Sequence, residues 1–482
     1  PWEAFAAFAV DLHNKNRPAE GPAELPVYKA KRNLDRSGEP APEIHLVTSG
    51  FEFVLHRHHA SRLHYDLRLE MDGALRSWAL PRGLPPRPGV KRLAVQTEEH
   101  PLKYLEFEGT IPAGNYGAGQ MWIFARGKFE ILKQKKDGFY VRLSSPQISA
   151  EYRLIELQNK EWLIERLDQP ARDFLLQPPA PMLADSAPVV PEQGRYFYEL
   201  KWDGIRAIFV LEEGQMRIFS RNGHEITDSF AELLRPDDLR ATTAVLDGEI
   251  VVLDADGRPV FEKVIKRMRK STSVKDRAVC YFFDVLYLDG RVLLNDPCEL
   301  RREWLVDILR DRQILRLSEA LDDGQALFAA VKESSLEGIV AKDRRSRYTP
   351  GERSASWLKI KVSSDCSLAI LGYTPGEGER SNSFASLVLG EWTQDGYRYR
   401  GRVGSGFNDK SLGHIRSRLD ELTPGKAWFS HSDLKKVTWT KEGLFADISY
   451  SSLTADGLLR APVFRRLRPD LSPEDCRLTG GE

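Results

Sequence analysis

The sequence contains few cysteines and no long apolar run. Only 4 cysteines occur among 482 residues, and none forms a C-x-x-C pair. Cysteines scattered in this way indicate a reducing compartment and argue against a zinc site. No segment approaches the roughly 20 consecutive apolar residues of a membrane-spanning helix, and the first residues lack the basic and apolar regions of a secretory signal. We therefore expect a cytoplasmic protein with no membrane partner.

The formal net charge is zero, because 70 Lys and Arg residues balance 70 Asp and Glu residues. A balanced charge usually counts against a nucleic-acid partner. The basic residues are unevenly placed, however, and cluster at Lys263–Lys270 and Lys342–Arg347. Such runs are more often solvated faces, but their place between the motifs described below favours a surface that faces phosphates.

The length and the 41% hydrophobic content predict several domains, each with its own core. A Pro-rich stretch cannot be the interior of a helix or a central strand and is typical of a linker. A second boundary is expected at Ser363-Ser364-Asp365. We thus expect a tail at 1–27 with a short helix over Trp2–Leu12, domains at 28–175, 193–362 and 363–482, and a linker at 176–192.

The expected fold class is α+β multidomain. Short alternating strands such as Phe139–Leu143 predict a mainly-β, barrel-like first domain. Hairpin signals at Glu213-Gly214 and Asp256-Gly257, with a helix near 325–333, predict antiparallel sheets flanked by helices in the second. Short strands separated by turns in the last domain predict a five-stranded barrel of the oligonucleotide-binding kind, the OB-fold.

A lysine ends an apolar run in Glu199-Leu200-Lys201-Trp202-Asp203-Gly204-Ile205-Arg206. A protonated lysine is a poor nucleophile, so covalent chemistry at Lys201 needs nearby cations or desolvation. Five further motifs follow in order: Ser220–Gly223, Asp247–Glu249, Phe282–Asp284, Glu337–Lys342 and Trp357–Lys361. This series resembles that of the nucleotidyltransferases that form a lysyl-AMP intermediate, the ATP-dependent DNA ligases and their mRNA-capping relatives.

The resemblance implies a role for each matched residue. Lys201 attacks the α-phosphate of ATP, and Lys359 and Lys361, which alternate along one strand, favour its deprotonated form and stabilise the leaving pyrophosphate. Glu249 and Glu337 are expected to hold Mg²⁺ or Mn²⁺. The remaining nucleotide-binding residues are expected to be Glu199 at the adenine edge, Phe283 stacked on adenine or packed in the core, Arg206 and Arg221 at ribose or phosphates, and Lys342 at a phosphate.

A second cluster, His56 to Arg68, holds four of the chain's 10 histidines. His64 and Asp66 alternate on a predicted strand and share one face. With His58 they supply two nitrogens and one carboxylate, which suits a metal with open positions. Arg68, on the same face, can bind phosphate oxygens bidentately. A single histidine is more often structural, but the cluster favours a site.

This cluster and the motifs Asp72–Pro81, Arg92–Val95, His100–Tyr104 and Phe107–Pro112 resemble the 3'-phosphoesterase domain of bacterial DNA ligase D over about residues 28 to 165. The resemblance implies Mn²⁺ ligands at His58, His64 and Asp66. It leaves His56 unassigned, and His59, where the family often has Asp, is either an extra ligand, a competitor or a bystander. It further implies phosphate-site residues at Arg68, Arg92, His100 and Tyr104, and a functional pair at Arg32 and Glu39.

Together the two resemblances imply a DNA-end repair enzyme that heals 3' ends and then seals nicks in non-homologous end joining. The expected partners are DNA, the Ku protein and a separate repair polymerase, and the protein is expected to act as a monomer at the nucleoid. One departure from ligase D is that no segment of the sequence matches its primase-polymerase domain. Two alternatives are an RNA ligase or capping enzyme and a non-catalytic DNA-end scaffold. Near the C-terminus, Arg468-Pro469-Asp470 keeps the R-x-D part of a family motif, but Leu471 replaces the usual lysine.

Overall fold

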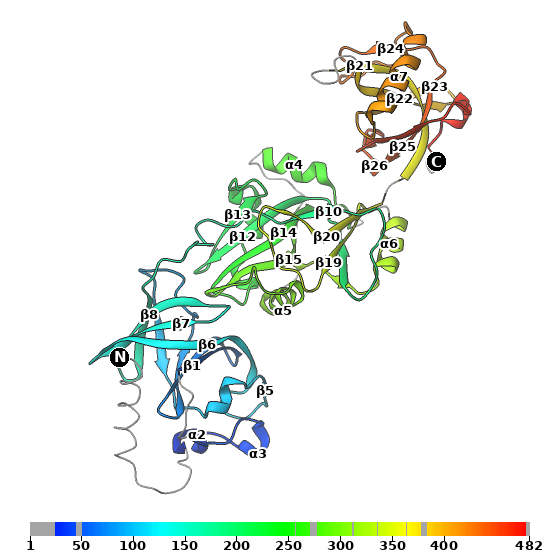
Figure 1. Cartoon of the computed structure of the whole chain (residues 1–482). Helices are drawn as coiled ribbons and strands as arrows, with labels where there is room; N and C mark the ends of the chain where they lie inside the picture. The colour runs from blue at the N-terminus through cyan, green and yellow to red at the C-terminus, as the bar shows by residue number, and fades with distance from the viewer. Residues whose placement is uncertain are drawn as a thin grey trace. The chain divides into compact units, whose positions relative to one another are not determined.

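The protein is described from a computed structural model (Figure 1). Contacts between residues divide the chain into two compact units. Unit 1 consists of Pro1–Leu183, Gly204–Ser318 and Arg345–Arg353, and unit 2 of Ala184–Asp203, Glu319–Arg344 and Ser354–Glu482. The structure describes residues 25–44, 51–255, 257–269, 277–310, 313–334, 336–362, 364–376 and 383–478. The helix expected over Trp2–Leu12 lies outside these ranges. Within them, no helix has the length and hydropathy to cross a membrane.

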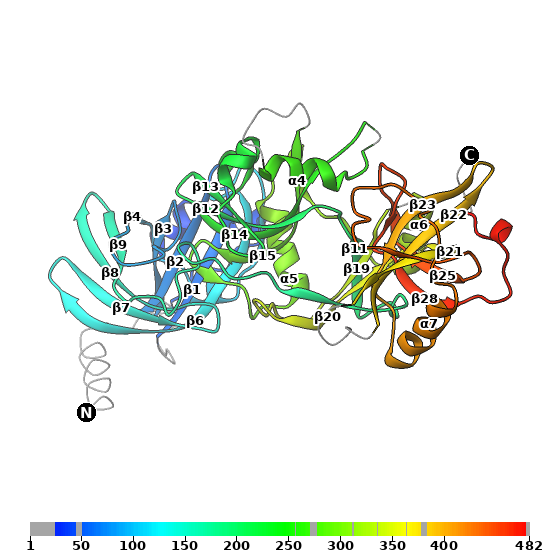
Figure 2. The same cartoon turned by 90° about the horizontal axis from the view of Figure 1, so that it is seen from above.

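The first half of unit 1 is a closed antiparallel barrel, as expected (blue and cyan in Figure 1; Figure 2). Its strands follow the order β1-β2-β3-β4-β9-β8-β7-β6, and β1 also pairs with β6, which closes the ring. Alternate apolar residues such as Leu55, Leu67 and Trp78 fill the interior. The strands are β1 (Glu52–His59), β2 (Leu63–Met71), β3 (Ala74–Leu80), β4 (Lys91–Gln96), β5 (Gly109–Ile111), β6 (Gly119–Lys135), β7 (Gly138–Ser144), β8 (Ser149–Gln158) and β9 (Glu161–Arg166).

An N-terminal arm packs on the barrel. It contains α2 (Pro26–Ala30) and α3 (Leu34–Ser37), and it meets the short 3₁₀ helix η1 (Leu102–Leu105). Tyr28 is fully buried in a small core with Val54 and Tyr104. Because Val54 opposes Arg68 in the β1–β2 register, this core lies on the strand face that carries the predicted metal ligands.

The second half of unit 1 is a sheet of order β13-β12-β14-β15-β16, with β17 paired to β15. The Glu213-Gly214 hairpin was predicted correctly: both residues have positive φ, 48° and 82°, as a type I′ hairpin turn requires. The elements are β12 (Ile205–Glu212), β13 (Gln215–Ser220), β14 (Thr243–Val252), β15 (Ala278–Leu288), β16 (Arg291–Val292), β17 (Leu315–Leu317), α4 (Phe261–Arg269), α5 (Cys298–Ile308), η2 (Thr227–Leu233) and η3 (Pro236–Asp238).

Unit 2 begins with a second sheet, of order β10-β20-β19-β11-β18. Its helix α6 (Gly324–Glu333) matches the predicted helix, and the Asp323 side chain caps it by accepting the Ala326 N–H. The strands are β10 (Leu183–Ser186), β11 (Tyr196–Leu200), β18 (Ala320–Leu321), β19 (Gly338–Asp343) and β20 (Arg353–Lys361).

The C-terminal part of unit 2 is an antiparallel sheet of order β23-β22-β21-β25-β28, with β24 on β21, which agrees with the predicted OB-fold. Helix α7 starts with a capping box between Asn408 and Ser411. The elements are β21 (Ser364–Pro375), β22 (Phe384–Thr393), β23 (Gly396–Val403), α7 (Asp409–Glu421), β24 (Thr438–Trp439), β25 (Phe445–Tyr450), β26 (Ser452–Leu453), β27 (Leu459–Arg460), β28 (Val463–Leu467) and η5 (Pro473–Asp475).

Two expected boundaries differ from the structure. The Pro-rich stretch 176–192 is not a plain linker, because Met182 is fully buried, donates its N–H to the Tyr348 hydroxyl at 2.9 Å and leads directly into β10. Its prolines lie outside that strand, where no ladder hydrogen bond is lost. The expected domain at 193–362 is divided between the units, because Gly204–Ser318 shares one continuous apolar core with the barrel.

Candidate metal and nucleotide sites

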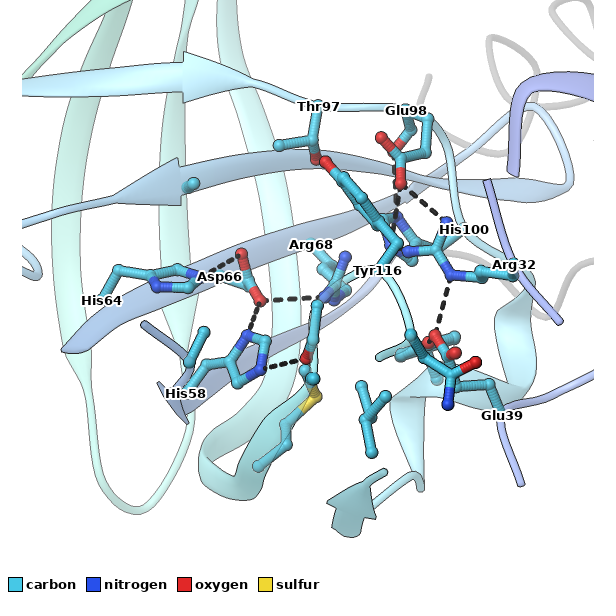
Figure 3. A pocket seen from close by; sticks show the side chains of 18 of the residues that line it. Arg32, Glu39, His58, His64, Asp66, Arg68, Thr97, Glu98, His100 and Tyr116 are labelled. Atoms are coloured by element: carbon cyan, nitrogen blue, oxygen red, sulfur yellow. Dashed lines mark hydrogen bonds and ion pairs between the residues drawn. The ribbon is translucent and has the colours of Figure 1, made fainter. Parts of the chain in front are cut away.

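The β1–β2 register brings the predicted metal ligands together. His58 lies opposite His64, and His56 lies opposite Asp66. As a result, ligand atoms of His58, His64 and Asp66 all lie within 4.8 Å of one another (Figure 3). The spacing alone predicted His64 and Asp66 on one face, and strand pairing adds His58 from the neighbouring strand.

The second nitrogen of each imidazole supports a metal at this place. His58 Nε2 lies 2.9 Å from the Gly117 carbonyl, and His64 Nδ1 lies 3.0 Å from the Arg62 carbonyl. A metal-binding histidine usually donates its other N–H to a carbonyl in this way, which leaves the remaining nitrogen free to bind. His58 Nδ1 is buried, makes no hydrogen bond among the described residues and lies 3.5 Å from Asp66 Oδ2. The donor set therefore fits a divalent cation with open positions.

Asp66 is held as a carboxylate. Arg68 Nη2 donates to Asp66 Oδ2 at 3.0 Å. Burial raises the pKa of the Asp66 carboxyl, but the charge of Arg68 and the contacts with His58 and His64 outweigh burial and hold this pKa well below its usual value. The ionised oxygen is the form that binds a metal.

Arginine and histidine side chains line the same cavity, which has a volume of 530 Å³ (Figure 3). Arg32 Nη2 lies 3.1 Å from His100 Nε2, and His100 Nδ1 lies 2.9 Å from the Glu98 carbonyl. Because a guanidinium only donates, Nε2 accepts and Nδ1 carries the hydrogen. Burial, with the charges of Arg68 and Arg32, lowers the pKa of His100 well below its usual value, which agrees with a neutral ring.

The predicted pair in the arm reaches this cavity. Arg32 Nε donates to Glu39 Oε1 at 2.7 Å, and the Tyr104 hydroxyl also donates to Glu39. The sequence prediction missed Glu98, whose side chain is 2% exposed and accepts from Arg32 Nη1 at 2.8 Å. Glu98 stands two residues before His100 in a segment without strand periodicity, so no local pattern pointed to it.

The two unassigned histidines have different environments. His56 lies on the cavity side of β1, where its Nε2 is 3.1 Å from the Phe107 carbonyl and its Nδ1 accepts from Arg68 Nε at 3.4 Å. Burial, with the charge of Arg68, lowers the pKa of His56 to about 3. His59 lies on the opposite side, next to Asp307, so the structure does not bring it into the ligand cluster.

The structure does not bring Arg92 to the cavity either. Its side chain is 2% exposed and donates to the Leu84 carbonyl at 2.8 Å and to Glu213 Oε1 at 2.5 Å. Through Nη1 and Nη2, these bonds hold the barrel to the β12–β13 hairpin. The prediction that Arg92 contacts the scissile phosphate disagrees with this location.

In unit 2, Lys201 follows β11 and its ammonium group pairs with Glu337 Oε2. Lys361 Nζ lies 3.0 Å from the other oxygen, Glu337 Oε1. Burial raises the pKa of Glu337, but the two lysines outweigh burial and keep this pKa below its ordinary value. Glu337 is therefore an ionised carboxylate between two cations, and Lys359 lies two residues before Lys361 on the same face of β20.

Glu199 and Lys342 form a buried pair next to this cluster. Lys342 Nζ lies 3.1 Å from Glu199 Oε2, both side chains are 2% exposed, and the ammonium group also lies 4.4 Å from the Trp357 ring centroid. On the other side of Lys201, Arg460 donates to Asp203 at 2.7 Å. The C-terminal domain thus supplies a partner to the lysine motif that the sequence did not suggest.

In unit 1, Arg206 is paired with Asp247. Its Nη2 donates to Asp247 Oδ2 at 2.6 Å, and its guanidinium lies 4.4 Å from the Phe283 ring centroid. The Phe283 ring is largely buried, at 8% exposure. Glu249 opposes Arg206 in the β12–β14 register and is half-buried, whereas Arg221 is exposed in a turn.

Comparison with known families gives three consecutive matches. Residues 56–156 match the DNA ligase D 3'-phosphoesterase domain, residues 181–361 the ATP dependent DNA ligase domain, and residues 380–471 the ATP dependent DNA ligase C terminal region. Among curated proteins, the multifunctional non-homologous end joining DNA repair protein LigD of Mycobacterium tuberculosis is 38% identical over 93% of this chain and 60% of its own length. The corresponding protein of Mycolicibacterium smegmatis is 37% identical over 94% of this chain and 61% of its own.

Among solved structures, the ligase domain of M. tuberculosis LigD is 34% identical and aligns with 62% of this chain and 98% of that chain, with a TM-score of 0.37. The chain described here spans about three-fifths of the length of the curated LigD proteins that it matches. The three family matches show that the chain has the domain composition of the DNA ligase D-like proteins. It joins a 3'-phosphoesterase domain to an ATP-dependent DNA ligase domain and its C-terminal region.

Proposed function

We propose that this protein repairs DNA ends by removing 3' blocks and then sealing the strand. The observation that carries the proposal is that one chain holds both the His58, His64 and Asp66 cluster and Lys201 paired with Glu337. The first suits metal-assisted phosphoester hydrolysis and the second suits covalent nucleotidyl transfer.

The barrel would hydrolyse a terminal 3'-phosphate. Water adds to phosphorus, the bond between phosphorus and the 3' oxygen breaks, and a proton passes to that oxygen, leaving a 3'-hydroxyl and inorganic phosphate. Arg68 and Arg32 face the cavity and suit phosphate oxygens, while His100 can hold a proton at Nδ1. A divalent cation, which we propose to be Mn²⁺, would supply Lewis-acid polarisation when bound by His58, His64 and Asp66.

The ligase domain would act in three steps. Lys201 Nζ attacks the α-phosphorus of ATP, and the bond to the β-phosphate breaks as pyrophosphate leaves. A DNA 5'-phosphate oxygen then attacks the lysyl-AMP phosphorus and releases the lysine. Finally the 3'-hydroxyl attacks the activated 5'-phosphate and AMP leaves. Glu249 and Glu337 are carboxylates suited to Mg²⁺ or Mn²⁺, and Glu199, Arg206, Arg221, Phe283, Lys342, Lys359 and Lys361 are the proposed nucleotide-binding residues.

For the whole protein we propose a place in non-homologous end joining, because the curated relatives carry that name. Its substrate would be nicked or broken DNA with 3'-phosphate or 3'-ribonucleotide ends, in the cytoplasm at the nucleoid. We further propose that it acts as a monomer with Ku and with a separate polymerase.

A nicked duplex with a 3'-phosphate tests both activities in one chain. With ATP and Mn²⁺, the wild-type protein should seal this nick. His64→Ala should lose sealing of the 3'-phosphate nick but keep sealing of a 3'-hydroxyl nick, because only the cluster loses a ligand. Lys201→Ala should release phosphate but seal neither nick.

The matched control is His224→Ala, which removes an exposed histidine outside both sites and should behave as wild type. Equal loss of both activities in His64→Ala would contradict separate sites. Labelling by GTP and not by ATP would favour the capping-type alternative instead.

A further inference from the structure

Strands β1 and β2 have two faces with different surroundings. On the first face, His58 opposes His64 and His56 opposes Asp66. His58, His64 and Asp66 line the metal cavity. On the second face, Arg57 opposes Tyr65. Because side chains alternate along a strand, each metal ligand here has a neighbour on the second face.

The second face is anchored on carboxylates of the ligase domain. Arg57 is fully buried, and its Nε donates to Asp307 Oδ2 at 2.8 Å while its Nη1 lies 3.4 Å from Asp289 Oδ2. The Tyr65 hydroxyl donates to the same Asp289 oxygen at 2.7 Å. His59 Nε2 also lies 3.3 Å from Asp307 Oδ1. Thus the residue on either side of His58 contacts Asp307.

The two carboxylates are themselves fixed in the ligase domain. Asp289 Oδ1 accepts the backbone N–H groups of Thr242 and Thr243, at 2.9 and 2.7 Å. Asp307 lies on α5, three residues after the buried Trp304, whose ring meets Phe124 of the barrel at a centroid distance of 5.4 Å. A buried arginine with fixed partners has few alternative positions, so the strand behind it is held in place.

We propose that Asp289 and Asp307 are positioning residues for the metal cluster, so that the ligase domain holds β1 and β2 from behind in the geometry that binds the cation. The inference rests on the metal site proposed above. Metal ligands must be placed within a few tenths of an ångström, and a strand anchored on one face transmits that placement to the other. The ligase domain would thereby set the metal affinity of the 3'-phosphoesterase.

The test measures Mn²⁺ binding by the full chain with electron paramagnetic resonance, which reports free and bound ion without turnover. Asp307→Asn keeps the shape of the side chain but removes the charge that pairs with Arg57. It should weaken Mn²⁺ binding roughly three- to tenfold, less than the 10–100-fold typical of a partner bonded directly to a ligand, and should alter the spectrum of the bound ion. Asp307→Glu, which restores the charge, should recover most of the affinity.

Glu212→Gln is the matched control. It breaks the pair between Arg87 and Glu212, which also joins barrel and ligase domain, but Arg87 lies in the segment between β3 and β4 and not on β1 or β2. Mn²⁺ affinity should stay at the wild-type value in this variant. Lysyl-AMP formation should stay normal in every variant, which shows that the ligase domain is folded.

Arg57→Lys provides a second, independent perturbation, because an ammonium group cannot reach all the partners of the guanidinium fork. If Asp307→Asn and Arg57→Lys both bind Mn²⁺ as the wild type does, the positioning role is refuted. An equal loss of affinity in Glu212→Gln would also refute it, since domain docking in general would then be the cause. If the wild type binds no Mn²⁺, or if His64→Ala binds it normally, the proposed metal site fails instead.

Discussion

Replacing Glu98 by glutamine tests how the N-terminal arm is held at the phosphate cavity. Glu98 accepts from Lys31 Nζ and Arg32 Nη1, both at 2.8 Å, and its side chain is 2% exposed. Burial raises its pKa, but Lys31 and Arg32 outweigh burial and keep this pKa below the ordinary value. The group is therefore ionised, and glutamine keeps its shape while it removes the charge.

The structure sets the size of the expected effect. Hydrogen bonds to a charged group contribute about 1.5–3 kcal/mol each, but glutamine keeps one acceptor oxygen, and Glu39 still binds Arg32 Nε. We expect the barrel to lose about 2 kcal/mol of unfolding free energy. Arg32 keeps one carboxylate partner and shifts, and a misplacement of about 1 Å lowers a catalysed rate by up to about 100-fold. A fall of about 10- to 100-fold in kcat/KM for 3'-phosphate release is expected.

The assay follows phosphate release from a 3'-phosphate duplex, with lysyl-AMP formation as the measure of intact folding. Glu151→Gln is the control, because Glu151 pairs with Arg142 on the exposed barrel surface, 2.7 Å apart, where an ion pair contributes less than about 1 kcal/mol. If Glu98→Gln retains kcat/KM within about twofold, Glu98 does not hold Arg32 for phosphate binding and the reasoning is refuted.

Three further outcomes are expected. Arg301→Met leaves the carboxylate of Asp284 buried without its partner, at 2.7 Å in the wild type, and should cost about 3–5 kcal/mol of unfolding free energy in urea titrations; an unchanged midpoint would contradict a structural role for the pair. The pKa of Asp66 is lower in the folded than in the unfolded chain, so in metal-free protein its stabilisation should be complete above about pH 5 and decline as the pH falls below about 4. Acid unfolding of Asp66→Asn should show a shallower pH dependence, and an identical slope would contradict this assignment. If adenine stacks on Phe283, Phe283→Ala should raise the ATP concentration for half-maximal labelling about tenfold, whereas a loss of folding with unchanged ATP affinity would mark it as core packing.

Local sequence patterns were sufficient to predict a structural feature where all the residues that determine it lie in one short segment. The alternation of His64 and Asp66 predicted a shared face, and the apolar run before Lys201 predicted a strand that ends at the lysine. The first prediction follows from the period of two along a strand, and the second from the apolar content of the run. The hairpin at Glu213-Gly214 was equally local, because its turn needs two residues with positive φ.

Contacts between distant segments could not be predicted in this way. The pairing of Arg92 with Glu213 joins residues 121 positions apart, and only the family resemblance had given Arg92 a role, at the phosphate. The burial of Met182 depends on Tyr348, which is 166 positions away. Composition marked that stretch as a linker because prolines are frequent there, although the four residues of β10 contain none.

Gly204, within the lysine motif, makes a close contact with a distant segment of the chain. A Cβ at this position would lie 2.2 Å from the carbonyl oxygen of Ile250, so β12 can start against β14 only with glycine. The glycine of the lysine motif is therefore explained by backbone approach.

The two-sided β1 strand also limits how the sequence can change in length. Inserting or deleting one residue between Glu52 and His59 would turn His58 toward the ligase domain and Arg57 toward the cavity, so that the cation site and the anchor would be lost in a single event. A change in the length of this strand keeps both faces only if it adds or removes two residues. Alternate residues of the histidine-rich segment thus serve the cation site and the contact with the ligase domain, and a shift in register changes both at once.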